Sequence, residues 1–284
     1  MFEFSVRVGP ASFRIGSAWE APLAEMARLY QGYPTPDIPD FTVRLEPVSW
    51  LRRFIRPSVA IHGDYMLPDA APLPLAQGLL AAEMGMNLQM ALGWRRQLIL
   101  HASAVERDGR ALIMTGASGS GKSTLSALLG QNGWRFLGDE FALIDPATGW
   151  VHPFPRPTSL KNEAIAAMLA IVPEARFGPL LKDTPKGDIR HLTPAADALA
   201  RMHEPATPAL LLYPRYGADA ATRVVGKAEN FVRLTQASTN YVALGEAGFG
   251  ALTRFVDRVP AIAVDYPDTA TALRAVNRLW KAHA

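Results

Sequence analysis

A glycine-rich loop near the middle of the chain restricts the fold more than any other feature. Residues 116–123 are Gly-Ala-Ser-Gly-Ser-Gly-Lys-Ser, the complete pattern of a phosphate-binding loop (P-loop), in which two glycines with four residues between them precede a lysine and a hydroxyl residue. Such a loop joins a strand to a helix, and the apolar, β-like residues 111–115 and the helical residues 125–129 agree with this. The sequence therefore predicts an α/β fold with a strand at 110–115 and a helix at 122–130.

The residue types in this loop are suited to holding a nucleotide. Glycines let successive backbone N–H groups converge on phosphate oxygens, and the N-terminus of the following helix attracts the same anion. Lys122 is expected to reach the β- and γ-phosphates, and the Ser123 hydroxyl is expected to bind Mg²⁺. The plainer alternative is a glycine turn without a nucleotide. The predicted cofactors are ATP, with GTP open as the alternative nucleotide, and Mg²⁺. The predicted binding residues are Gly116, Ala117, Ser118, Gly119, Ser120, Gly121, Lys122, Ser123 and Thr124.

The amino-acid composition argues against several other classes of protein. Of 284 residues, 49% are hydrophobic and 19% charged, as in globular enzymes, and the net charge of +3 is too small to indicate nucleic-acid binding. The chain has no cysteine, which removes thiolate metal sites and disulfides. The N-terminus lacks a signal-peptide pattern, and polar residues interrupt the most apolar stretch, 73–94. We expect a cytoplasmic protein that binds neither membrane nor nucleic acid.

Two regions differ in their pattern. Residues 1–72 alternate short β-like runs with Pro- and Gly-rich turns, and they predict a smaller β-rich N-terminal unit. Residues 73–284 predict the domain that carries the P-loop. Strands are expected at 2–8, 12–16, 41–45, 59–62, 96–104, 135–137, 141–144, 209–213 and 261–265; helices at 21–30, 74–92, 161–169 and 269–283; and a polar loop at 182–191.

The residues around the loop indicate a family. His101 stands in a strand as His-Ala-Ser-Ala-Val, a turn and a second strand lead to the P-loop, and the acidic pair Asp139-Glu140 follows. This layout resembles the catalytic domain of the HPr kinase/phosphorylase family, and it is most similar to the HPr-kinase-related kinases found beside small PqqD-like peptide-binding proteins. The resemblance covers residues 98–144 well. It implies a P-loop kinase domain of the HPr kinase/PEP carboxykinase-like type that phosphorylates a serine hydroxyl.

The resemblance also implies roles for particular residues. His101 matches the active-site histidine, and Asp139 and Glu140 fall on the paired carboxylates, one of which accepts the proton of the substrate serine. Asp139 is expected to share Mg²⁺ with Ser123. The second carboxylate is Glu here where the family has Asp, so either acid remains a candidate base. The plain alternatives are a solvated turn or a purely metal-binding pair for the acids, and a strand-end histidine satisfied by backbone for His101.

Two cations after the acidic pair are further candidates. Arg156 and Lys161 flank a Pro-rich turn, and either could neutralise the transferring phosphate, although a stiffened surface loop is an equal explanation. Residues 182–191, which include Lys186, could form a mobile lid. The family's Leu-Glu-Ile-Arg-Gly signature is absent, with Pro-Arg-Pro-Thr-Ser-Leu-Lys at 155–161 and Thr-Pro-Lys-Gly at 184–187 instead.

The function predicted from all of this is an ATP- and Mg²⁺-dependent kinase that transfers the γ-phosphate to a hydroxyl, with serine of a peptide or protein favoured. Two alternatives remain open: a kinase of a small molecule such as free serine, and a nucleotide-binding regulator in a peptide-modification system with no transfer of its own. A PqqD-like protein is a candidate partner. HPr kinases are hexamers, so a homo-oligomer is also considered.

Overall fold

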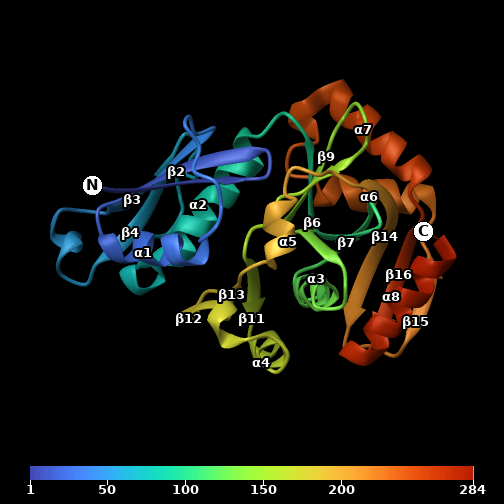
Figure 1. Ribbon diagram of the computed structural model, residues 1–284. Coiled ribbons are helices and arrows are strands. Elements are labelled where there is room, and N and C mark those ends of the chain that lie inside the picture. The colour runs from blue at the N-terminus through green and yellow to red at the C-terminus, as the bar shows by residue number, and fades with distance from the viewer. Residues whose placement is uncertain (284) are drawn as a thin grey trace. The chain divides into compact units, whose positions relative to one another are not determined.

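The computed structural model describes residues 1–283. Within them the chain is a mixed α/β structure with three sheets and eight α-helices, and it forms two compact units. Unit 1 combines Met1–Trp94 with Ser159–Thr193, and unit 2 combines Arg95–Thr158 with Pro194–Ala284. Figure 1 labels their elements. The sequence pattern divides the chain at residue 72 instead, so helix α2 (Gly78–Gly93) and the segment after Ser159 group differently in the two descriptions.

The larger sheet of unit 1 has the strand order β1-β2-β3-β4-β5. Its strands are β1 (Phe2–Val8), β2 (Ala11–Ser17), β3 (Phe41–Pro47), β4 (Ser58–Gly63) and β5 (Leu73–Pro74). Strands β2 and β3 are parallel and are joined through α1 (Glu20–Leu29), and the other pairs are antiparallel. Helix α2 packs on β3 and β4. A Cβ atom at Gly85 would lie 2.5 Å from a methyl of Val43, so this close approach requires glycine.

The second sheet of unit 1 corrects one prediction. Its order is β11-β13-β12, with β11 (Thr158–Lys161), α4 (Glu163–Leu169), β12 (Phe177–Thr184) and β13 (Gly187–Leu192). The expected polar loop at 182–191 is wrong, because β12 and β13 form an antiparallel hairpin there. Leu181 and Ile189 are paired and buried while the residues on either side of each are more exposed, and this alternation of exposure is typical of a strand.

Unit 2 is built on one mixed sheet with the order β10-β9-β6-β7-β14-β16-β15, and β8 also pairs with β6. Its strands are β6 (Leu98–Arg107), β7 (Arg110–Thr115), β8 (Arg135–Gly138), β9 (Phe141–Ile144), β10 (Val151–His152), β14 (Thr207–Tyr216), β15 (Ala221–Val224) and β16 (Ala261–Tyr266). Strands β7, β14 and β16 are parallel. The P-loop therefore leaves the sheet at the same edge as the last residues of β14 and β16.

Helices cover both faces of this sheet (Figure 1). On one face lie α3 (Lys122–Gly130) and α8 (Thr269–His283), and on the other α6 (Lys227–Ala237) and α7 (Gly245–Arg258). Strand β7 alternates accordingly: Leu112 and Met114 join the α3 and α8 core, while Ala111 and Ile113 join the α6 and α7 core. A short helix, α5 (Ala196–Ala200), precedes β14.

Most of the expected elements are confirmed within a few residues, and the predicted helix at 122–130 matches α3 at both ends. Helices α6 and α7 were not predicted from the sequence. Trp134, Phe136 and Phe141 are buried, as expected for core residues. Among residues 1–283, no helix has the length and apolar character needed to span a membrane.

Candidate functional site

The P-loop connects the end of β7 to the first turn of α3. Gly119 and Gly121 have φ of 82° and 95°, in the left-handed region that glycine adopts without strain. Gly121 is also crowded: a Cβ atom there would lie 2.7 Å from the hydroxyl oxygen of Tyr266 and 3.3 Å from the Cβ of Tyr216. The glycine at this position is therefore required by both backbone and packing.

Lys122 is the first residue of α3 and is almost fully buried. Its Nζ donates hydrogen bonds to the carbonyl oxygens of Gly116 at 2.8 Å and Ala117 at 3.0 Å. The ammonium is thus folded back over the loop that the sequence pattern assigns to the phosphates. The backbone of Ser120 connects the loop to β14, because its carbonyl accepts from the N–H of Tyr216 at 3.3 Å.

Strand β6 determines where the acidic pair lies. The first half of β6 pairs with β9 and the second half with β8, so the turn between β8 and β9 lies opposite the middle of β6. Asp139 is in that turn and is 3% exposed, and one of its oxygens, Oδ1, accepts a short hydrogen bond from the hydroxyl of Ser103. The backbone N–H of Ala102 donates to the carbonyl of Glu140 at 3.2 Å.

The electrostatics of Asp139 are unusual. Burial raises its pKa above the ordinary value of 3.8, and the neighbouring charge of Glu140 raises it further. The hydroxyls of Ser103 and Ser123 act in the opposite direction, so the P-loop serine is near enough to influence this carboxyl group. The second oxygen, Oδ2, is buried and has no hydrogen-bond partner among the described residues. A buried oxygen without a partner is costly, and it is typical of a site that receives a proton, a cation or water.

Glu140 and His101 form the more open part of the same site. Their side chains are 34% and 46% exposed, and His101 Nε2 lies 3.3 Å from Glu140 Oε2. Glu140 has φ of 71°, a conformation that costs a residue with a side chain about 1–2 kcal/mol. Thr115 Oγ1 donates to the carbonyl of His101 at 2.8 Å, which connects the end of β7 to the histidine.

The predicted cations fall into different units. Arg156 belongs to unit 2 and is buried, two residues after Phe154, whose N–H donates to the carbonyl of Leu137 in β8 at 2.6 Å. The segment with Arg156 therefore runs beside the strand that leads into Asp139. Lys161 is the last residue of β11 and belongs to unit 1, as do Lys186 and the rest of the β12–β13 hairpin.

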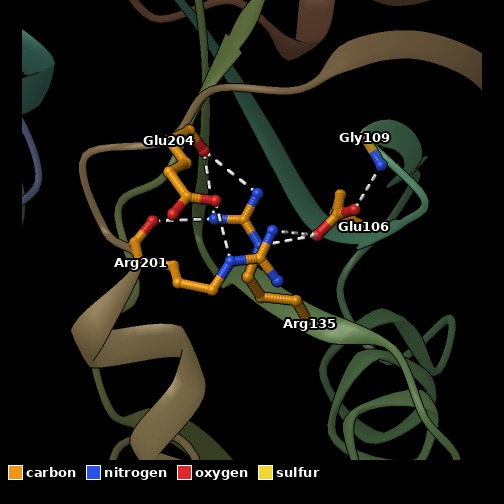
Figure 2. A network of polar contacts seen from close by, with 5 residues as sticks. All are labelled: Glu106, Gly109, Arg135, Arg201 and Glu204. Atoms are coloured by element: carbon orange, nitrogen blue, oxygen red, sulfur yellow. Dashed lines mark hydrogen bonds and ion pairs between the residues drawn. The ribbon is translucent and has the colours of Figure 1, made fainter.

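A buried ion-pair network supports this part of the sheet (Figure 2). Glu106 in β6 accepts from Arg135 Nε in β8 at 2.6 Å, and Arg135 also donates to the carbonyls of Arg201 and Glu204. Burial alone would raise the pKa of Glu106. The pKa is instead held below its ordinary value, because Glu106 accepts hydrogen bonds from Arg135 and from the Gly109 N–H and lies near the positive charges of Arg135 and Arg201. The network holds β8 against β6 immediately before the turn that contains Asp139 and Glu140.

Sequence reasoning missed Ser103 and Tyr266. Ser103 stands two residues after His101, on the same face of β6, and this spacing alone could have indicated it. Nothing in the sequence indicated Tyr266, because its contact with the P-loop depends on β16 lying next to β14. No cluster of three or more His, Asp or Glu side chains that could hold a metal is present in residues 1–283. A nucleotide-bound Mg²⁺ does not require one, since phosphates and water supply most of its ligands.

Comparison with known proteins gives a partial match. A family model described as SynChlorMet cassette protein ScmC matches residues 81–208, a stretch that contains the P-loop, the acidic pair and Arg156. No curated protein matches the chain.

Proposed function

We propose that this protein is an ATP- and Mg²⁺-dependent kinase that transfers the γ-phosphate to a hydroxyl, with a peptide or protein serine as the favoured acceptor. The observation that carries the proposal is the association of the P-loop with a buried carboxyl group: β6 pairs with β7, which leads into the loop, and with β8 and β9, which flank Asp139. We also propose that unit 2 is a P-loop kinase domain of the HPr kinase/PEP carboxykinase-like type. The matched family's description names no reaction, so the proposal depends on the site itself.

Lys122 and the loop amides form the phosphate-binding part of this proposal. The ammonium now bonded to Gly116 and Ala117 would exchange these carbonyls for β- and γ-phosphate oxygens. The first turn of α3 adds backbone N–H groups and the positive end of its dipole. In phosphoryl transfer, positioning and neutralisation of this kind supply most of the catalysis.

The residues present fit a magnesium ion. Asp139 Oδ2 is a buried oxygen without a partner, and the Ser123 hydroxyl lies close enough to lower the pKa of the same carboxyl group. A carboxylate and a hydroxyl, completed by water and phosphate oxygens, are ligands that Mg²⁺ accepts. When bound, the ion supplies positive charge to the transferring phosphate. Ser103 orients Asp139 through the hydrogen bond to its other oxygen.

The proton acceptor in this proposal is one of the two carboxylates. A buried carboxyl group committed to a metal is a poor base, whereas Glu140 is partly exposed, is paired with His101 and is held in a strained conformation. Strain at a residue with an exposed functional group is frequently associated with function. These features favour Glu140 as the base that takes the proton of the acceptor hydroxyl, with His101 holding its carboxylate. Arg156, which belongs to the same unit as the P-loop and the acidic pair, remains a candidate for neutralising the transferred phosphate.

A transfer experiment with the full chain tests the proposal. The protein is incubated with γ-labelled ATP and Mg²⁺, with serine-containing peptides, with free serine, or with no acceptor, while calorimetry measures nucleotide binding. Label on a peptide serine supports the proposal, and label on free serine alone supports the small-molecule alternative. Nucleotide binding without transfer to any acceptor supports the regulator, and absence of nucleotide binding contradicts all three.

A further inference from the structure

A loop of unit 1 exposes an unusual combination of side chains. Residues 48–56 connect β3 to β4, and every one of them is exposed. We call them the 48–56 loop. Trp50 is 79% exposed and Phe54 70%, and their apolar neighbours Val48, Leu51 and Ile55 are also exposed. Single exposed apolar residues are normal, but five large ones within nine residues typically mark an interaction surface.

The loop also carries positive charge without any negative charge. It contains Arg52, Arg53 and Arg56, and no Asp or Glu occurs from residue 47 to residue 63. None of these three arginines forms an ion pair within residues 1–283. Aromatic residues and arginine are the types most enriched at the centres of protein interfaces.

The backbone of the loop is held in place by its own unit. Trp19 Nε1 donates to the carbonyl of Arg53 at 3.0 Å, and Arg53 donates back to the carbonyl of Ala18 at 3.3 Å. Arg52 donates to the carbonyl of Arg56 at 3.2 Å, across the turn that follows the 3₁₀ segment Leu51–Arg53. A fixed loop loses little conformational entropy when it binds, which favours a partner of defined shape.

We infer that the 48–56 loop is a docking surface for an acidic segment of another protein, one that alternates carboxylates with apolar side chains. Carboxylates of the partner would pair with Arg52, Arg53 and Arg56, and its apolar side chains would cover Trp50 and Phe54. Charge complementarity identifies the partner as acidic, and the fixed backbone favours a folded or folding peptide over a lipid surface. The inference does not depend on phosphate transfer, so an experiment can contradict docking without contradicting kinase activity, and the reverse.

The test uses the full chain and a fluorescein-labelled peptide of alternating acidic and apolar residues. Its matched counterpart carries Asn and Gln in place of Asp and Glu. We expect the acidic peptide to bind about tenfold more tightly than the amide peptide at low salt, with the difference shrinking as salt rises. The double variant Trp50→Ala/Phe54→Ala should weaken binding of the acidic peptide about tenfold or more. Trp150→Ala is the control, because Trp150 is also exposed (48%) but belongs to unit 2.

Charge reversal makes the test specific. Arg52→Glu/Arg53→Glu should remove the preference for the acidic peptide and favour a version with Lys at the acidic positions, while circular dichroism confirms an unchanged fold. Equal affinity for acidic and amide peptides would overturn the inference, as would unchanged binding by the Trp50/Phe54 variant. Two other results would also overturn it, each with peptide binding absent. In one, these substitutions abolish binding to phosphatidylserine-containing vesicles; in the other, they abolish self-association measured by sedimentation.

Discussion

The hydroxyl of Tyr266 occupies the space that a side chain at Gly121 would need. The tyrosine ends β16, two strands from the strand that leads into the P-loop, and its ring lies edge-on to that of Tyr216 at 6.1 Å between centroids. Side chains at the ends of β14 and β16 therefore restrict the conformation of the loop that is predicted to hold phosphate. Loop conformation and sheet packing are linked at this one contact.

The first prediction concerns this contact. Gly121→Ala should lower the free energy of unfolding by about 1–2 kcal/mol through backbone strain, and should also abolish nucleotide binding because the loop must move away from Tyr266. Gly149→Ala is the matched control: Gly149 has φ of 77° and open space around it, so it carries the strain without the clash. Calorimetry with Mg²⁺-ATP and thermal unfolding measure the two effects. Unchanged ATP affinity in Gly121→Ala would contradict the role of the contact.

The second prediction concerns the P-loop lysine. Lys122→Ala should reduce phosphate transfer by about 100-fold or more, because the ammonium no longer neutralises the phosphates. The substitution also removes two hydrogen bonds to the loop carbonyls of Gly116 and Ala117, a local loss that should leave the protein folded. Lys227→Ala serves as the control, since Lys227 is exposed and paired with Asp257 at 2.8 Å. Turnover at the unsubstituted rate by a folded Lys122→Ala protein would refute the assignment of the loop.

The third prediction separates the two carboxylates. Glu140→Gln should lower kcat by about 100-fold with little change in ATP affinity, because a general base acts in the transition state. Asp139→Asn should instead weaken Mg²⁺-dependent nucleotide binding, and Ser103→Ala should do so less severely because it removes only the orienting hydrogen bond. If Glu140→Gln and Asp139→Asn lose ATP binding in proportion to activity, the pair is a metal site only and the base lies elsewhere.

The fourth prediction concerns the pH dependence of stability. The pKa of Glu106 is held below 4.5, so its pairing with Arg135 stabilises the fold at pH above that value and is lost as the pH falls through the lowered pKa. Glu106→Gln should cost about 2 kcal/mol of unfolding free energy at neutral pH, and the difference from the unsubstituted protein should shrink in acid. Denaturant unfolding across pH measures it. Glu229→Gln removes the pairs that this more exposed carboxylate forms with Arg223 and Arg233, and it should have a much smaller effect.

The part of the fold that the sequence predicts well is local. Helix α3 follows from the P-loop pattern, and β7 follows from an unbroken apolar run, because each of these signals lies within a few adjacent residues. The β12–β13 hairpin was missed because its sequence includes the charged residues Lys182, Asp183 and Asp188, so its composition resembles that of a loop. Residues brought together by strand order, such as Tyr266 and Gly121, leave no such signal. The same limit applies to Lys161. It belongs to unit 1 whereas Arg156 belongs to unit 2, and no sequence pattern indicates this division.

The discontinuous make-up of both units has a consequence for synthesis on the ribosome. Unit 1 lacks its second sheet until residue 193 has left the exit tunnel, and strand β7 lacks its parallel neighbour until β14 (Thr207–Tyr216) follows. Strand β16 (Ala261–Tyr266), which supplies Tyr266 to the P-loop, emerges later still. Neither unit can therefore complete its folding early in translation, and one edge of β7 stays unpaired until β14 has emerged. A chain cut short before β16 would carry the full glycine motif without the support that shapes it.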